Sequence, residues 1–299
     1  MQHDAQQRIH AMFPVRSGKW FGSRRLPRPE EDLEDQGLGF DVTTLLERRR
    51  VLSVIGLGAA AAGLAACGAA APTGATSSSA ALEEIPDETA GPFPGNGSNG
   101  PDVLQESGIL RSDIRSSFGT GSATAEGVPM TLELTILSVA DGTPLAGAAV
   151  YVWHCDRDGN YSLYSDGVEN ENYLRGAQVA DDEGRVRFTS IVPACYPGRW
   201  PHVHFEVYPD QESITEPTNA IAVSQMALPQ DVCEAAYASR GYERSVRNMA
   251  MLSLETDMVF GDDGGASQLA AVTGDAASGY VVTLTAPVDA RAADSGTGS

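Results

Sequence analysis

The feature that most constrains the fold is a series of short segments, from residue 130 onward, in which apolar and polar residues alternate. A period of two is typical of strands that bury one face, and clusters of Gly, Pro and Asp between the segments indicate turns. The expected strands are 130–137, 148–153, 186–191, 202–208, 220–228 and 280–288, with one short helix at 230–239. Short strands with little helix predict an all-β fold, an antiparallel β-sandwich with short helices and long loops.

The first 67 residues have the pattern of an export leader. Arg48-Arg49 is a twin-arginine pattern, an Ala/Gly/Leu-rich stretch covers 51–66, and residues 64–67 form a lipobox-like sequence that ends at Cys67. We therefore expect export by the twin-arginine route and a lipid anchor at Cys67, with the protein extracytoplasmic and attached to the membrane only through that lipid. A transmembrane helix over 51–66 is the alternative, but the stretch is short and its Ala and Gly residues are poorly hydrophobic.

Composition divides the rest of the chain into three parts. Residues 68–85 are rich in Ala, Ser, Thr and Gly and are expected to form a flexible tether. Residues 86–290 carry the strand signals and are expected to form the folded domain, and 291–299 a disordered tail. The formal net charge of −20 argues against nucleic acid as a partner.

Three cysteines follow Cys67 in the sequence. They are Cys155, Cys195 and Cys233. Disulfides persist outside the cytoplasm, so one bridge and one thiol is the simplest expectation. The sequence leaves three pairings open. Cys155–Cys233 is slightly favoured, because Cys195 adjoins a residue that is expected to bind a metal.

Two of the three histidines that follow Cys67 form His202-Val203-His204 inside an expected strand. Side chains alternate along a strand, so these two face the same way, with Cα atoms roughly 6.5–7 Å apart. Two imidazoles in this arrangement can reach one metal ion. The alternative is a polar strand edge that faces solvent, and the neighbouring residues decide between the two.

Two tyrosines near this pair indicate which metal would suit it. Tyr196 lies six residues before His202, and Tyr161 directly follows Gly159-Asn160. Two phenolates and one hydroxide balance the charge of a ferric ion, whereas the same three anions would over-neutralise zinc or ferrous iron. Because a phenol normally loses its proton at about pH 10, only a strong Lewis acid keeps it ionised near neutrality. These residues therefore favour Fe(III).

With these motifs, the sequence resembles the intradiol ring-cleavage dioxygenases, and among them the exported single-domain members. The resemblance runs from about residue 88 to about residue 228 and is densest over 150–161, 174–184 and 196–204. It implies that 86–290 is a catalytic domain for aromatic compound catabolism. Its substrates would be a catechol-type ring and O2, and it would cleave the ring between the hydroxyls to give a muconate-type dicarboxylic acid.

The resemblance also implies roles for individual residues. The ligands of the Fe(III) would be Tyr161, Tyr196, His202 and His204. Tyr196 would be the ligand that the substrate displaces, and Arg199 would lie beside the substrate ring. Gln225 would neighbour the same site.

Other interpretations of these residues remain open. Tyr164 follows Tyr161 by three residues and could be the ligand instead. Arg199 could form a surface ion pair, and Gln225 could simply satisfy strand backbone. His154, which follows a strand tryptophan, is expected to be structural. The chain as a whole could also be a non-catalytic surface β-sandwich that binds or spaces, and a zinc hydrolase would need a carboxylate base that the sequence does not place beside the histidines.

Overall fold

The computed structural model describes residues 20–21, 24–25 and 82–290. Most of the expected leader and tether, with Arg48, Arg49 and Cys67, and the expected tail 291–299 lie outside the described residues. The short strands β1 (Trp20–Phe21) and β2 (Arg24–Arg25) pair in antiparallel fashion.

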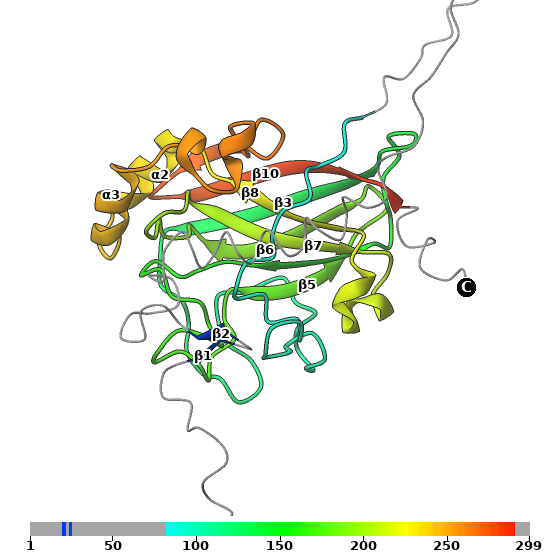
Figure 1. The fold of residues 1–299 in the computed structure, drawn as a ribbon, viewed down its shortest axis with the longest axis horizontal. Helices are drawn as coiled ribbons and strands as arrows, with labels where there is room; N and C mark the ends of the chain where they lie inside the picture. Colours follow the sequence, from blue (N-terminus) through cyan, green and yellow to red (C-terminus); the bar gives the residue numbers. More distant parts are fainter. Residues whose placement is uncertain (1–19, 22–23, 26–81, 291–299) are drawn as a thin grey trace, which may run out of the picture.

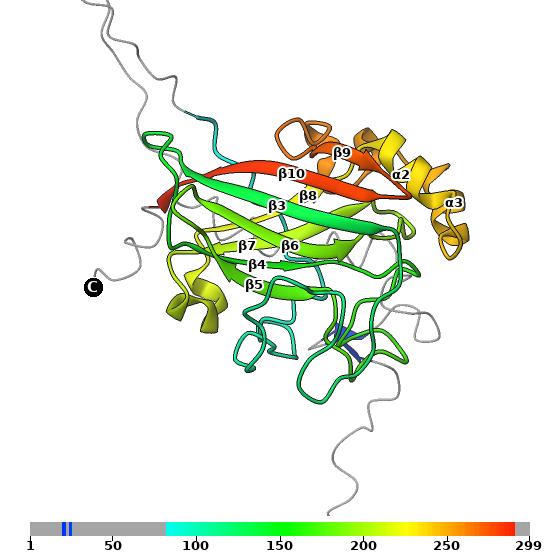
Figure 2. The same ribbon diagram turned by 180° about the vertical axis from the view of Figure 1, so that it is seen from behind.

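Two four-stranded sheets pack face to face and form the expected sandwich (Figures 1 and 2). In order across the first sheet lie β6 (Arg185–Ile191), β3 (Pro129–Ser138), β10 (Gly279–Val288) and β9 (Ala271–Asp275). The second sheet consists of β5 (Arg175–Val179), β4 (Ala149–Trp153), β7 (His202–Tyr208) and β8 (Ala222–Ala227). The all-β class is therefore confirmed.

The strands expected from the sequence all exist, and the two four-stranded sheets contain two more. β5 and β9 were not expected, because neither shows a run of alternating apolar residues. Within the two sheets every strand pair is antiparallel except β3 with β10, which run in parallel.

Strand β7 is buried along its whole length, because both of its faces are covered. Val203, Phe205 and Val207 point into the core between the two sheets. The second face carries His202 and His204, and loops cover it in place of a third sheet. The alternation expected from the sequence thus separates a packing face from a polar face.

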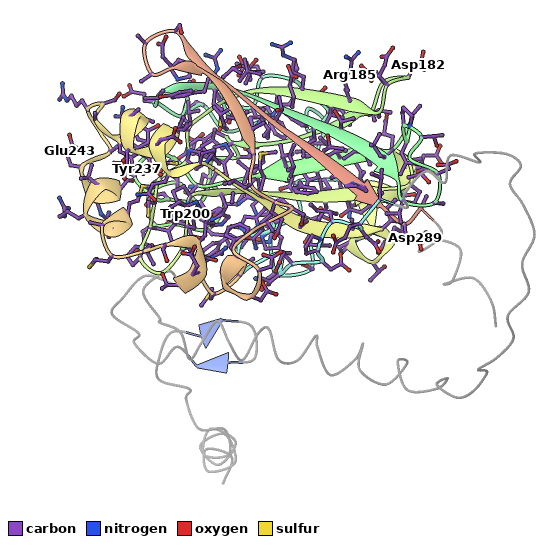
Figure 3. All side chains as sticks on the ribbon, turned by 90° about the horizontal axis from the view of Figure 1, so that it is seen from above. Asp182, Arg185, Trp200, Tyr237, Glu243 and Asp289 are labelled. Atoms are coloured by element: carbon purple, nitrogen blue, oxygen red, sulfur yellow. The ribbon has the colours of Figure 1, made fainter. Side chains whose placement is uncertain are left out.

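Helices gather at one end of the sandwich. They are α2 (Gln230–Tyr237), α3 (Glu243–Met249) and the 3-10 turns η4 (Leu254–Thr256) and η5 (Phe260–Asp262), while η2 (Glu212–Thr215) and η3 (Pro217–Asn219) lie elsewhere. Figure 3 places Trp200 at this end, with Tyr237 and Glu243, whereas Asp182 and Arg185 lie at the opposite end. Over the described part of the chain no helix has the length and apolarity needed to cross a bilayer.

A segment that we call the strap, residues 85–96, crosses the polar face of the second sheet. Its backbone bonds to β8, where Glu88 N–H donates to Val223 O at 2.6 Å. Asn96 donates to Glu206 on β7 at 2.8 Å. Ile85, expected to be the last residue of the tether, is instead 3% exposed and donates to Pro287 O. The folded domain therefore begins before residue 86, because Ile85 fills part of the core.

The expected disulfide between Cys155 and Cys233 is not formed, and the described cysteines are thiols. Cys155 packs in the cluster on the polar face of the second sheet, whereas Cys233 packs in the core between the sheets.

Candidate metal centre

His202 and His204 lie on β7 between two partner strands. In register with His204 are Trp153 on β4 and Gln225 on β8. The Trp153 ring stacks on the His204 imidazole with centroids 4.8 Å apart and an angle of 4° between the planes. Each histidine is 2% exposed, so neither forms the solvent-facing strand edge that the sequence left open.

Four donor atoms from three segments converge beside these histidines. The Nε2 atoms of His202 and His204 are 3.1 Å apart, and Tyr196 Oη lies 3.4 Å from His202 Nε2. Tyr161 Oη lies 3.4 Å from Tyr196 Oη. The two tyrosines come from different loops, one after β4 and one before β7, so the fold brings together residues that are 35 positions apart.

The imidazoles are neutral in this environment. Burial, with the nearby Arg199 charge, lowers the pKa of His202 to about 3, and burial together with His202 lowers the pKa of His204 well below its usual value. His202 Nδ1 lies 2.5 Å from Trp200 O, which can only accept, so the hydrogen is assigned to Nδ1 and Nε2 keeps its lone pair. A lone pair of this kind is what a metal ion requires.

Hydrogen bonds to the protein do not satisfy all the ring nitrogens of His202 and His204. His204 Nδ1 is buried and has no hydrogen-bond partner among the described residues. If His204 Nε2 donates to His202, a bare acceptor remains at Nδ1. If both Nε2 atoms carry lone pairs, they repel each other at 3.1 Å unless a cation lies between them. The arrangement therefore fits a bound cation.

The phenols of Tyr161 and Tyr196 indicate which kind of cation would suit this site. Burial, together with Tyr196, raises the pKa of Tyr161 well above its ordinary value, so this phenol ionises only beside a strong positive charge. Tyr161 is 1% exposed, whereas Tyr196 is only partly buried. Among the described residues no group of three or more His, Cys, Asp and Glu side chains could hold a metal. A metal at this site would thus depend on the two tyrosines.

Tyr164 lies apart from these four atoms. Its hydroxyl accepts a hydrogen bond from Gly95 N–H of the strap at 2.9 Å. The Arg175 guanidinium carbon lies 5.4 Å from the centroid of its ring. The geometry therefore favours Tyr161 as the ligand of the two.

Arg199 is buried beside the donor atoms and does not form a surface ion pair. Its NH2 donates to Gln225 Oε1 at 2.5 Å, and its Nε donates to Asp257 Oδ2 at 3.1 Å. Gln225 Nε2 in turn donates to Thr89 O of the strap. Burial acts to lower the pKa of Arg199, but Tyr196 and Asp257 outweigh it and raise the pKa, so the guanidinium is charged.

Aromatic side chains and the strap close the site. Phe93 packs on Tyr161 with ring centroids 4.9 Å apart, and Phe260 lies edge-on to His202 at 6.4 Å. A Cβ placed on Gly91 would lie only 3.3 Å from His204 Cε1. Aromatic rings thus border the donor atoms.

His154 stands outside the site, as expected. Its ring nitrogens lie 2.7 Å from Cys155 O and 2.7 Å from Ser190 Oγ. The residues that border the site but were not found from the sequence include Gly91, Asp257 and Phe260. No local pattern marks Asp257 or Phe260.

Part of the chain is similar in sequence to known proteins. Residues 99–214 match the model of the family described as Dioxygenase. The chlorocatechol 1,2-dioxygenase of Rhodococcus opacus is 34% identical over 91 residues, which are 26% of this chain and 35% of that protein. The catechol 1,2-dioxygenase of Candida albicans is 34% identical over 80 residues, which are 26% of each chain. The match thus spans about a third or less of the length of these relatives.

A solved structure shares the fold. The intradiol ring-cleavage dioxygenase from Tetranychus urticae superposes with a TM-score of 0.56 at 21% identity, over 70% of this chain and 96% of that chain. The matched residues 99–214 include both tyrosines, both histidines and Arg199. Over these residues the chain is similar to the family described as Dioxygenase, and it shares the fold of this intradiol ring-cleavage dioxygenase.

Proposed function

We propose that the chain is a non-haem Fe(III) dioxygenase that cleaves a catechol-type ring between its two hydroxyls, with O2, to give a muconate-type dicarboxylic acid. The convergence of two phenol oxygens and two neutral imidazole nitrogens beside a buried arginine carries this proposal. Relatives that are named for action on catechol, chlorocatechol and hydroxyquinol support the substrate class.

The iron would be held by Tyr161, Tyr196, His202 and His204. When bound there, Fe(III) supplies Lewis-acid polarisation of the diol toward O2. Two phenolates favour the ferric ion over zinc or ferrous iron, because they match its higher charge and the burial of Tyr161 demands a strong Lewis acid.

Tyr196 would take part in proton transfer. It is the more exposed of the two phenols and lies on the loop before β7, so it can leave the donor cluster with the least loss of packing. As a phenolate it can accept at Oη one of the hydroxyl protons that a catechol must lose. Tyr161, which is buried against Phe93, would stay in place throughout.

Arg199 would stabilise negative charge on the reacting ring. Its guanidinium is desolvated and held by Gln225 and Asp257, so it needs no reorganisation when charge develops. Replacing it with alanine should lower kcat by about 10²–10³-fold, which is typical when one fixed donor is lost. The iron content should hardly change, since Arg199 is not a ligand.

The decisive experiment uses purified, iron-loaded protein and a panel of catechol, protocatechuate and hydroxyquinol. We expect a red to brown resting protein, oxygen uptake, and a dicarboxylic acid that carries both atoms of labelled O2 by mass spectrometry. A yellow semialdehyde product, or activity that requires ferrous iron, would overturn the proposed chemistry. Colourless protein that iron does not reconstitute would overturn the site itself and favour a non-catalytic module.

We further propose that the enzyme is exported by the twin-arginine route and anchored through lipid at Cys67. The leader pattern supports this proposal, and a pathway that carries folded proteins is suited to a passenger that holds a metal.

A further inference from the structure

Asp257 is a buried carboxylate that lies between η4 and η5, outside the family match. Its side chain is 0% exposed, and the residue follows the end of the match at 214 by more than forty positions. A buried carboxylate is costly unless several donors surround it. Four donors surround this one, and they come from two different parts of the site.

Each carboxylate oxygen accepts two hydrogen bonds. Oδ2 accepts from Arg199 Nε at 3.1 Å and from Trp200 N–H at 2.6 Å. Oδ1 accepts from the backbone N–H groups of Val259 at 2.8 Å and Phe260 at 3.1 Å. Burial acts to raise the pKa of Asp257, but Arg199 and the Trp200 N–H outweigh it and keep the pKa below its ordinary value. The group is therefore an anion.

The guanidinium of Arg199 is consequently fixed from two directions. Asp257 holds Nε, and Gln225 holds NH2 at 2.5 Å. A planar guanidinium that is held at two of its nitrogens cannot pivot about a single contact. Gln225 alone would leave the group free to pivot about one contact.

The same carboxylate also fixes two neighbours of His202. Trp200, whose N–H bonds Asp257, has its carbonyl 2.5 Å from His202 Nδ1. Phe260, whose N–H bonds the other carboxylate oxygen, lies edge-on to the His202 ring. The Asp257 side chain is thus hydrogen-bonded to Arg199, to the backbone before β7 at Trp200 and to the backbone of Phe260.

We propose that Asp257 is the positioning residue for Arg199, holding the guanidinium in the orientation that acts on the substrate ring. This inference rests on the proposed function. It assigns a role to a C-terminal segment that lies beyond the matched residues and beyond the motifs of the sequence.

A purely structural ion pair predicts different behaviour from a positioning residue. A buried ion pair that only stabilises the fold should alter the unfolding temperature and the yield of iron-loaded protein. A positioning residue should alter kcat through Arg199. A misplacement of about 1 Å in a group that acts on the reacting atoms can cost about 10² in rate, while substrate affinity changes little.

The test compares Asp257→Asn, Arg199→Gln and the double variant, all iron-loaded, with wild type. The quantities measured are kcat on catechol, the catechol dissociation constant without O2 from the visible spectrum, the iron content per chain and the unfolding temperature. Asp257→Asn should lower kcat about 10- to 100-fold. Iron content and catechol affinity should stay within about threefold, so that the loss falls on kcat rather than on KM.

The double variant decides whether Asp257 acts through Arg199. In the Arg199→Gln background, Asp257→Asn should change kcat by less than about threefold, because no guanidinium remains to be misplaced. An equal loss in both backgrounds, or a wild-type kcat for Asp257→Asn, would overturn the inference.

Glu206→Gln serves as the matched control. Glu206 is a carboxylate on β7, 2% exposed, that accepts from Asn96 and from Tyr208 and is not bonded to Arg199. Its replacement should lower the unfolding temperature, and any loss of kcat should be equal in the wild-type and Arg199→Gln backgrounds, because Glu206 bonds the strap and not the guanidinium. A kcat loss that disappears in the Arg199→Gln background, as expected for Asp257→Asn, would show that any buried carboxylate has this effect, which contradicts the inference.

Asp257→Glu covers the case in which Asp257→Asn does not fold. It keeps the charge but moves the carboxylate by one methylene, so the variant should fold and bind iron but have a lower kcat. Full activity of this variant would refute the positioning role. A wild-type protein that turns over no diol overturns the proposed function, whereas an active wild type with an equally active Asp257→Glu overturns only this inference.

Discussion

Gly91→Ala probes the contact between the strap and the metal centre. Gly91 has φ +68°, a conformation in which an L-residue costs about 1–2 kcal/mol. The new Cβ would lie 3.3 Å from His204 Cε1 and 3.8 Å from His204 Nε2. At a distance of 3.3 Å the His204 ring must move by a few tenths of an ångström. His204 is buried and stacked on Trp153, so the imidazole has little room to retreat.

The displacement is small for a core side chain but large for a metal ligand. Ligand distances in metal sites are held within about 0.2 Å, and disturbing the shell around a ligand typically costs about 10- to 100-fold in metal affinity. We therefore expect Gly91→Ala to lower the free energy of unfolding by about 1–2 kcal/mol and iron affinity by about tenfold or more.

Gly119→Ala is the matched control, because it separates backbone strain from contact. Gly119 has φ +67°, and a Cβ there meets nothing within 4 Å. In urea unfolding of the metal-free protein, Gly91→Ala should lose at least as much stability as Gly119→Ala, because it adds the contact with His204 to the same backbone strain. Only Gly91→Ala should lose iron during dialysis against a chelator. Equal iron retention in the two variants would show that the strap does not hold His204 in place.

Three further outcomes are expected. Tyr196→Phe should retain more iron than His204→Ala, as measured by metal content, because a displaceable ligand contributes less to holding the metal than a permanent one; the reverse order would contradict the assignment. Cys67→Ser should move the protein from the membrane fraction to the soluble fraction, and unchanged retention would rule out the lipid anchor. Burial lowers the pKa of His154 to about 4, so the unfolded chain binds a proton below its ordinary pKa of 6.5 that the folded chain does not. The stability that neutral His154 contributes above pH 6.5 is thus lost as the pH falls toward 4, by about 1.4 kcal/mol per pH unit. In urea unfolding, the free energy of the His154→Gln variant should therefore depend less on pH than that of the wild type.

Much of the sandwich could be predicted because its strands carry the period-two pattern. β3 buries every second residue, and β7 sends Val203, Phe205 and Val207 to the core while its histidines take the opposite face. β5 has no such pattern. Its buried positions are filled by Arg175, Gly176 and Ala177, and the arginine is tolerated only because Ser162, Pro94 and Tyr151 bond its guanidinium.

The site was predictable where it depends on local spacing and not where it depends on tertiary contact. His202 and His204 share a face by the geometry of any strand. Asp257 contacts Arg199 across 58 residues of sequence, and no motif near residue 257 announces this. The expectation of one disulfide was wrong for the same reason, because sequence spacing does not reveal whether two sulfur atoms come within bonding distance.

The parallel pairing of β3 with β10 has a consequence for the order in which the protein folds. β10 lies inside its sheet, between β3 and β9, and pairs with β3 from Tyr280 and Met130 to Val288 and Ser138. Roughly 150 residues separate these partners, so the pairing closes a very long loop and is intrinsically slow. During synthesis β3 can pair with β6 on one side, but its other edge has no partner until β10 has left the ribosome. The nascent chain therefore carries an unpaired β3 edge while residues 139–288, about half of the chain, are made, and this edge is open to pairing with other chains during that time.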